Sequence, residues 1–507
     1  MSDPLDRLAR QAFETHIVVA GGGIAGLVAA RECAKVGLHV TVLEASEVFG
    51  GVVRSEEVGG LTLDVGAESF ATRGGVVRAL LDDLGLGDAV VSPNPAGAWV
   101  AGVPGVGAAP LPKGGVLGIP DNPFAPDVRR IIGWSGTWRA YLDRLRPPLT
   151  IGHQRSLGIL VRTRMGARVL DRLVAPVTSG VYSARPDDID VDLAAPGLNA
   201  ALTRTGSLSG AVAELRLGRA ATARPADAPA SDVPVAAASD GAAAPRTPAP
   251  GGAVQGIAGG MARLVDALVA ELRDLGVELR TGVAVEALAP VDGGWLATTS
   301  ADAEPVRADA VIVALPEGPA RALLAPVVPS LEVGDPVAPV VEVVTLVLHA
   351  PVLDDAPRGT GVLTVPGSHV AKALTHSTAK WDWVRDATEP GVHVVRVSFG
   401  AQGEEPATAA LDDDAAARLA LSEAAAMFGV ELPASALRAS RRVRYVQSQP
   451  AATIGRAAET AAARGAVSAV AGLGVTGAWI AGTGLAQVIP DAHREADRVR
   501  SAALWHR

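Results

Sequence analysis

The sequence predicts an α/β fold in which strand and helix elements typical of nucleotide-binding domains occur at both ends of the chain, with antiparallel sheet between them. A short apolar run ends in a glycine-rich turn within 16–30, and β-branched stretches occupy 340–350 and 391–400. A strand, a glycine-containing loop and a helix are expected over 477–504. This order indicates a Rossmann-like dinucleotide domain interleaved with an α+β substrate domain that contains a mixed antiparallel sheet.

The N-terminal segment predicts a βαβ unit. HIVVA at 16–20 is expected to form a buried strand, 24–36 a helix closed by Gly37, and 38–45 a second strand. The turn between the first strand and the helix carries the G-x-G-x-x-G pattern that dinucleotide-binding turns need.

Each glycine of this pattern has its own physical task. Gly21 permits the tight turn, Gly23 lets a pyrophosphate approach the backbone, and Gly26 lets the helix pack closely on the strand. The helix N-terminus then faces the negative charge. Glu44 ends the second strand, where its carboxylate can accept ribose hydroxyls, and this disfavours the 2′-phosphate of NADP.

The composition limits the class of protein. The chain has 507 residues, 49% of them hydrophobic but only 3% aromatic, and no segment has the length of apolar sequence that a membrane span needs. We expect a cytoplasmic protein of several domains. The single cysteine, Cys33, excludes an internal disulfide framework, and no metal site is expected. The net charge of −9 argues against a nucleic-acid partner.

A basic segment lies within this acidic chain. Ten arginines occur between Arg129 and Arg172, against the two acids Asp143 and Asp171, and helical periodicity predicts an amphipathic helix that ends before Pro176. Three interpretations remain open: a solvated helix face, a pocket wall that binds carboxylates, and a surface that rests on anionic lipid.

The remaining chain predicts a domain order. Residues 218–252 are rich in Ala and Pro without periodicity, so we expect a disordered insertion that tolerates deletion. The dinucleotide domain is expected at 14–90, 253–318 and 456–507. The substrate domain is expected at 91–217, which includes a helical lid, and at 319–455.

The segment after Glu44 distinguishes between FAD and NAD as the cofactor. Gly50 and Gly51 follow in a Glu-x5-Gly-Gly pattern, with Arg54 close behind. The pattern resembles the segment that continues beneath the FAD pyrophosphate in flavoprotein oxidases of the amine-oxidase type. We therefore predict FAD as the cofactor.

Further motifs resemble one family of such flavoproteins, the porphyrinogen oxidases of haem biosynthesis. This family includes protoporphyrinogen oxidase and bacterial coproporphyrinogen III oxidase, and the second group is the more similar. The motifs run nearly end to end. They are GGGIAGLVAA, EASEVFGG, LDVGAESF, APVTSGVYSARPDDI, GGMARLVDAL, TGVAVEAL, THSTAKWDW and the VIPD near the end.

The resemblance implies a set of FAD contacts. Ala486, Gln487 and Val488 occupy the place of a Gly-Val-Gly loop near the flavin ring, and Tyr445 falls where the family tends to have Trp. The full implied set is Gly21, Gly22, Gly23, Ile24, Ala25, Gly26, Glu44, Ala45, Gly50, Gly51, Gly66, Ala67, Glu68, Ser69, Val283, Tyr445, Ala486, Gln487 and Val488.

The resemblance also implies a reaction. A porphyrinogen loses six electrons, so three rounds of flavin reduction are expected, with dioxygen as acceptor and hydrogen peroxide as product. The arginine-rich segment favours coproporphyrinogen, with four propionates, over protoporphyrinogen, with two. Arg73 and Lys380 are the candidates for substrate positioning, and no catalytic side chain is assigned.

Three alternatives stay open. They are a protoporphyrinogen oxidase, an amine or carotenoid flavoenzyme of the same fold, and a flavin-binding protein without turnover that acts as a partner in the haem pathway. The missing glycines at 486–488 keep the last alternative open. Peripheral membrane contact and haem-pathway enzyme partners are also left open.

Overall fold

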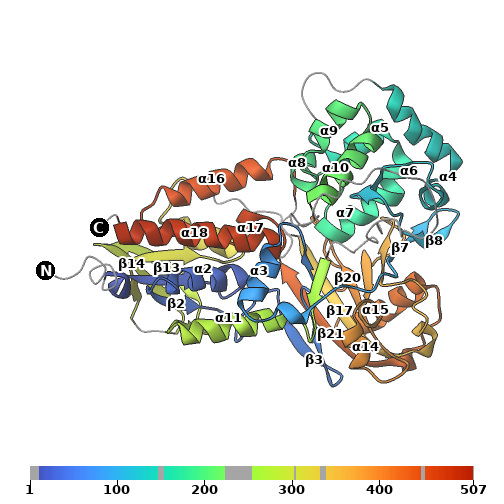
Figure 1. The fold of residues 1–507 in the computed structure, drawn as a ribbon. Coiled ribbons are helices and arrows are strands. Elements are labelled where there is room, and N and C mark those ends of the chain that lie inside the picture. Colours follow the sequence, from blue (N-terminus) through green and yellow to red (C-terminus); the bar gives the residue numbers. More distant parts are fainter. Residues whose placement is uncertain are drawn as a thin grey trace, which may run out of the picture. The chain divides into compact units, whose positions relative to one another are not determined.

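The computed structural model describes residues 11–146, 154–222, 254–301, 304–331, 339–446 and 452–505. The chain forms two compact units. The first contains residues 1–94, 253–357 and 374–507, and the second contains residues 95–252 and 358–373. Figure 1 shows the helices and strands of both units.

A five-stranded parallel sheet forms the centre of the first unit. Its order is β12 (Glu278–Arg280), β2 (His39–Leu43), β1 (His16–Ala20), β16 (Ala310–Val313) and β22 (Leu473–Val475). Strands β1, β16 and β22 are largely apolar because both faces of the sheet are covered there, and all four residues of β16 are buried. The two strands predicted at the N-terminus are confirmed.

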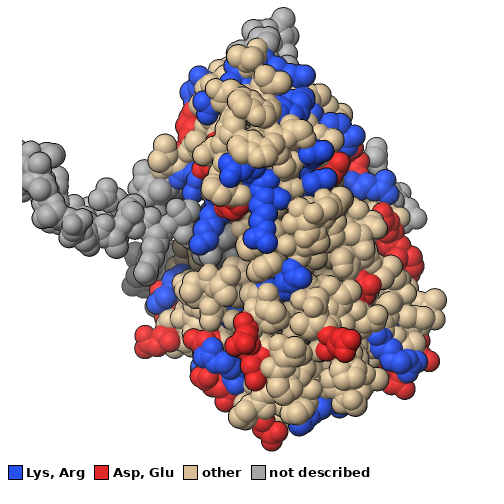
Figure 2. Space-filling model, turned by 90° about the vertical axis from the view of Figure 1, so that its right-hand side faces the viewer, with Lys and Arg blue, Asp and Glu red and all other residues tan. Residues whose placement is uncertain are grey.

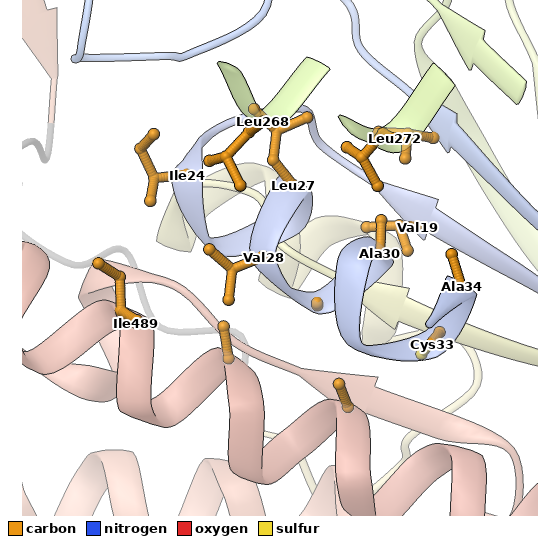
Figure 3. Packing of buried hydrophobic residues seen from close by; sticks show 14 of the residues in the cluster. Val19, Ile24, Leu27, Val28, Ala30, Cys33, Ala34, Leu268, Leu272 and Ile489 are labelled. Atoms are coloured by element: carbon orange, nitrogen blue, oxygen red, sulfur yellow. The ribbon is translucent and has the colours of Figure 1, made fainter. Parts of the chain in front are cut away.

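Three helices pack together beside this sheet. Helix α2 (Ile24–Ala34) contacts α11 (Ala262–Asp274) and α18 (Leu485–Trp505). Figure 3 shows Leu27 of α2 near Leu268 of α11, and Val28 near α18. Cys33 is a free, buried cysteine in the same cluster. The predicted helix after the glycine turn is confirmed, and so is the expectation that Cys33 packs there.

Antiparallel strands form the rest of the unit's core. Strand β17 (Val340–His349) pairs with β20 (Val392–Phe399) on one side and β21 (Leu437–Val446) on the other. Helix α15 (Asp413–Phe428) packs on these strands, and the side chain of Asp412 caps it by accepting the Ala415 N–H at 2.7 Å. The predicted α/β class with a mixed sheet is confirmed.

Smaller elements complete the first unit. They are β3 (Ser55–Val58), β4 (Leu61–Asp64), β5 (Phe70–Ala71), α3 (Val76–Asp83), β6 (Val90–Val91), β11 (Val254–Ile257), β13 (Val285–Val291), β14 (Gly294–Thr299), β15 (Val306–Ala308), α12 (Glu317–Leu324), β19 (Ala373–His376), α13 (Ser377–Lys380), α14 (Asp382–Asp386), α16 (Arg456–Ser468) and α17 (Ala478–Ala481).

The second unit is mainly helical. Its strands are β7 (Ala98–Val103), β8 (Gly107–Pro110), β9 (Gly115–Val116), β10 (Ile119–Pro120) and β18 (Gly361–Thr364). Its helices are α4 (Pro126–Tyr141), α5 (Leu157–Arg164), α6 (Ala167–Val169), α7 (Ala175–Tyr182), α8 (Val191–Ala194), α9 (Leu198–Thr205) and α10 (Leu208–Thr222). Strand β18 runs parallel to β7, which pairs antiparallel with β8.

Three local predictions are wrong. The helical backbone does not end before Pro176, because proline lacks an N–H and is tolerated in the first turn of α7. The strand expected within 477–481 is helix α17, since Gly477 adopts a φ of 117° and ends the extended chain after β22. Residues 218–222 of the predicted insertion belong to α10, and its other residues lie outside the described part.

None of the helices in the described ranges combines the length and the apolar character that crossing a membrane requires.

Candidate functional site

The three motif glycines differ in the space around them. A Cβ on Gly21 would lie 2.6 Å from the carbonyl oxygen of Ala314, and a Cβ on Gly26 would lie 1.9 Å from the carbonyl oxygen of Gly21. A Cβ on Gly23 would meet no atom within 4 Å among the described residues, its two chain neighbours aside. Gly21 and Gly26 are therefore required by protein packing, whereas the backbone of Gly23 borders open space.

This open space lies at the N-terminus of α2. The first helical hydrogen bond runs from the Leu27 N–H to the Gly23 carbonyl at 3.0 Å, and no side chain caps the helix. The N–H groups of Ile24, Ala25 and Gly26 precede that bond, so they are not used by the helix ladder. Such N–H groups, together with the helix dipole, favour an anion such as a phosphate.

A second glycine turn lies against the first. The Gly50 N–H donates to the Gly22 carbonyl at 2.9 Å, and Gly23 and Gly50 form an isolated β-bridge. A Cβ on Gly51 would lie 3.6 Å from the Cα of Gly23. Two turns of bare backbone thus meet beside the open space. A dinucleotide pyrophosphate fits such a cradle, because the space at Gly23 is open among the described residues.

Glu44 is oriented by neighbouring donors. Its Oε2 accepts the Gly22 N–H at 2.7 Å, and its Oε1 accepts the N–H and the hydroxyl of Ser46 at 2.8 and 2.7 Å. A carboxylate offers about four acceptor sites, so capacity remains for a ribose hydroxyl. The Val283 N–H donates to the Glu44 carbonyl at 2.9 Å, which places Val283 beside Glu44 and the exposed Ala45.

The third predicted loop, Gly66 to Ser69, rests on the second. A Cβ on Gly66 would lie 2.0 Å from the Val52 carbonyl oxygen, and the Ala67 N–H donates to that same oxygen at 2.9 Å. The backbone of this loop therefore packs against Val52, the residue that follows the Gly50, Gly51 turn.

The Glu68 carboxylate is buried in a charged network. It accepts from Lys380 Nζ, from Arg396 Nη1 at 2.8 Å and from the Ser377 hydroxyl at 3.3 Å. Burial alone would raise the pKa of Glu68, but the charges of Lys380 and Arg396 lower it from 4.5 to about 2. These partners occupy the carboxylate, so any cofactor contact of Glu68 would come from its backbone.

Arg396 is a residue that the sequence reasoning missed. It lies on β20, and its Nη2 donates to the carbonyls of Val65 and Gly66 at 3.1 and 2.5 Å. It thereby ties the third loop to the antiparallel sheet. The available signal was an arginine inside the β-branched run VHVVRVSF, where a buried cation needs partners.

Tyr445 reaches the same loop. A Cβ on Gly66 would lie 2.9 Å from the Tyr445 hydroxyl, and this hydroxyl is buried without a hydrogen-bond partner among the described residues. Burial raises the pKa of Tyr445. A buried hydroxyl that lacks a partner is costly, and a bound cofactor would supply an acceptor or donor.

Residues 486–488 form the first turn of α18 and not a loop. The N–H groups of Gln487 and Val488 both donate to the Gly484 carbonyl, at 3.0 and 3.1 Å. The Gln487 amide covers Gly482, because a Cβ there would lie 1.8 Å from its Oε1. Residues 486–488, which lack the family's glycines, thus lie in a helical turn. The N–H groups of Gln487 and Val488 are already hydrogen-bonded within that turn.

The two candidates for substrate positioning differ in environment. Arg73 is exposed in the turn before α3, with no ion pair to any residue that the structure describes. Lys380 is paired with Glu68, so its ammonium group already has a carboxylate partner. A substrate contact of either residue stays a prediction.

The basic segment covers much of the second unit, and Figure 2 shows Lys and Arg side chains gathered on that unit's surface. Four of its arginines bind backbone carbonyls within the unit: Arg139 to Arg164, Arg164 to Gly206, Arg168 to Ile132, and Arg172 to Ile131. These arginines hold helices and loops together, and fewer cations than predicted are left for a carboxylated ligand.

Comparisons with known proteins agree with this geometry. The family of flavin containing amine oxidoreductases matches residues 24–500. The chain is 30% identical over 417 residues to the coproporphyrinogen III oxidase of Mycobacterium leprae, across 81% of this chain and 83% of the relative. It is 28% identical over 503 residues to the enzyme of the same name from Propionibacterium freudenreichii, across 97% and 92%.

A solved structure supports the fold. A protein from Exiguobacterium named as a protoporphyrinogen oxidase superposes with a TM-score of 0.76 at 23% identity, over 97% of this chain and 99% of that one. The chain belongs to the family of flavin-containing amine oxidoreductases. It is an FAD-dependent oxidoreductase, and the predicted cofactor and the resemblance to porphyrinogen oxidases are confirmed.

Proposed function

We propose that this flavoenzyme oxidises coproporphyrinogen III to coproporphyrin III. The observation that carries the proposal is the match, along most of the chain, to enzymes named coproporphyrinogen III oxidase. The reaction removes six electrons and six protons from a tetrapyrrole with four methylene bridges. When bound, FAD supplies two-electron oxidation, so one substrate needs three rounds and reduces three dioxygen molecules to three hydrogen peroxide molecules.

The chain's own residues bind and orient the reactants. The N–H groups of 24–26 and the bare turn at Gly50 and Gly51 hold the pyrophosphate. Glu44 accepts a ribose hydroxyl. Arg396 fixes the loop at 66–69, so that its backbone keeps one geometry during turnover.

Two porphyrinogens compete as substrates on chemical grounds. Coproporphyrinogen carries four propionates and protoporphyrinogen two, so the first needs more cationic partners. The basic second unit and the exposed Arg73 support the tetracarboxylate. The relatives' names support the same choice.

A direct test uses the purified holoenzyme. Its visible spectrum should show bound flavin, and aerobic incubation with coproporphyrinogen III should produce fluorescent porphyrin and three equivalents of peroxide, faster than with protoporphyrinogen IX. A yellow protein that forms no porphyrin from either substrate would instead support the flavin-binding partner without turnover. A higher rate with protoporphyrinogen IX would reverse the substrate assignment.

A peripheral membrane contact and a cytoplasmic location stay predictions. In helix α4, Trp134 and Trp138 are 59% and 55% exposed, and the Arg129 guanidinium lies 4.4 Å from the centre of the Trp134 ring. Exposed aromatic and basic side chains together favour the interface of an anionic bilayer. Sedimentation with vesicles of anionic and of neutral lipid would test this contact.

A further inference from the structure

Lys372 is a partly buried cation of the second unit that has no carboxylate partner among the described residues. Its Nζ donates to the Ser183 hydroxyl at 2.6 Å, and no ion pair to Lys372 occurs among the residues that the structure describes. Burial lowers the pKa of Lys372 from 10.5 to about 8, so the group is still mostly protonated at pH 7. A charge held in this way is costly unless an anion compensates it.

The surroundings of Lys372 are built from two packed elements. Ser183 follows α7 within the motif APVTSGVYSARPDDI, is fully buried, and adopts a φ of 52°, which is uncommon for a residue with a side chain. A Cβ on Gly180 would lie 2.6 Å from Leu363 Cδ2, so α7 lies close to β18. The Lys372 carbonyl accepts from Thr364 at the end of β18, which fixes the lysine backbone.

Lys372 differs in this respect from the arginines of the basic segment. Arg164 is more deeply buried than Lys372, and it pairs with Asp143 and with a backbone carbonyl. Arg172 donates to a backbone carbonyl. Among the described residues, the side-chain partner of Lys372 is the neutral hydroxyl of Ser183, so a ligand anion would compensate a charge that has no counter-ion there.

We infer that Lys372 and Ser183 form a carboxylate-binding subsite that takes one propionate of the substrate. The inference rests on the proposed function, which supplies the carboxylates. The ammonium group donates a charge-assisted hydrogen bond to a propionate oxygen, and the Ser183 hydroxyl, which accepts from Lys372 Nζ, holds the ammonium group in place. The subsite then determines affinity for carboxylated porphyrins and takes no part in electron transfer.

Equilibrium binding of coproporphyrin III to the FAD-loaded protein tests the subsite. Lys372→Met should weaken binding about tenfold, a loss of about 1.4 kcal/mol. Lys372→Arg should restore affinity to within about threefold, and FAD content should stay the same in both variants. The matched control is Lys113→Met, which removes an exposed lysine of the same unit. Unchanged affinity in Lys372→Met would overturn the subsite.

A second measurement does not depend on turnover. The chain contains only four lysines, Lys35, Lys113, Lys372 and Lys380, so ε-13C-lysine labelling gives a resolvable NMR signal for Lys372, assigned with the Arg variant. Coproporphyrin III should shift this signal, and an unmoved signal would overturn the subsite. If wild type forms no porphyrin, the proposed function fails. Propionate alone is then the probe: a shift of the Lys372 signal keeps the carboxylate subsite, and its absence removes it.

Discussion

Gly23 and Gly26 share one motif, yet the structure gives them opposite responses to substitution. Gly23 has open space where a side chain would start and an extended φ of −70° that any residue can adopt. A Cβ on Gly26 would lie 1.9 Å from a backbone oxygen that cannot move away. We therefore predict that the first glycine serves the cofactor, whereas the second is required by the packing of the fold.

We predict that Gly23→Val abolishes FAD retention while the apoprotein keeps its stability to within about 1 kcal/mol, as expected for a change at a helix N-cap. Gly26→Val should instead destabilise the apoprotein itself. The ratio of flavin to protein absorbance and the urea unfolding of both apoproteins check this pair. Full flavin occupancy in the Gly23 variant would contradict the assignment of the open space to FAD.

Glu68 predicts a sensitivity to acid. Its pKa is lowered to about 2 in the folded chain, so its contribution to stability is complete above 4.5 and is lost as the pH falls from 4.5 toward 2. The difference corresponds to about 3 kcal/mol. Glu68→Gln should be less stable than wild type at pH 7, because Lys380 and Arg396 lose their shared carboxylate, and it should lack this loss at low pH.

The difference in unfolding free energy between wild type and Glu68→Gln, measured with urea at several pH values, isolates the contribution of Glu68 to stability. Burial raises the pKa of Asp64 to about 6, so this nearby group acts in the opposite sense and lowers stability as the pH rises from 3.8 to 6. Because Asp64 is present in both proteins, most of its effect cancels. Parallel pH profiles for wild type and Glu68→Gln would contradict the role of Glu68.

At the residue scale, the glycines of the turn could be identified from the sequence, but the arginine that supports a neighbouring loop could not. The spacing of Gly21, Gly23 and Gly26 follows from local chain geometry, so it is visible in one sequence. Arg396 could not be found, because its carbonyl partners Val65 and Gly66 lie in a distant segment, and only the folded chain brings them within hydrogen-bond distance.

At the element scale, β20 supports the loop at 66–69 through one side chain. Arg396→Met removes the donors to two carbonyls and leaves Glu68 with one cation. We predict a loss of about 3 kcal/mol in unfolding free energy and about tenfold weaker FAD binding. The control is Arg385→Met in α14, whose guanidinium is 54% exposed in an ion pair with Asp382. Equal effects of the two variants would contradict the supporting role of β20.

Element prediction succeeded where the signal was local and failed where packing decided. The alternating β-branched residues of β17 and β20 indicate antiparallel strands, and the pairing confirms them. The AWIA segment has the apolar character of a strand, but Gly477 and Gly482 both take positive φ values and leave only one helical turn, α17, between them. The sequence shows these glycines without showing their conformation.

At the scale of the whole molecule, a buried ionic cluster joins segments that enter the first unit late in the chain. Asp491, within the VIPD motif, accepts from Arg464 of α16 at 2.6 and 2.8 Å and from the Thr476 hydroxyl at 2.9 Å. Glu495 accepts the Val475 N–H of β22 at 2.9 Å. The cluster fixes α16 and α18 to the edge of the parallel sheet.

Arg464→Met should cost about 3 to 5 kcal/mol, since it leaves two buried carboxylates short of a cation. The matched control is Arg494→Met, because Arg494 also binds Asp491 but is 71% exposed, and its loss should cost less than about 1 kcal/mol. Thermal and urea unfolding of both variants measure the difference. A similar small effect in both would show that the cluster contributes little to the fold.

The domain boundaries of the chain were harder to predict than its fold class. Elements at both ends indicated a dinucleotide domain, but composition and periodicity carry no information about which distant strands become neighbours. The exact boundaries of the FAD and substrate domains stay a prediction. This includes the assignment of 319–455 to the substrate domain.

The strand order of the parallel sheet also bears on when FAD can bind during synthesis of the protein. Strand β1 leaves the ribosome first, yet its neighbour β16 pairs through Ile17 and Ala310, and β22 joins only at Leu473 to Val475. Contacts so distant in sequence form slowly, because a long loop must close before they are gained. The glycine turn is thus synthesised early but completed late, so FAD is expected to enter after translation rather than during it.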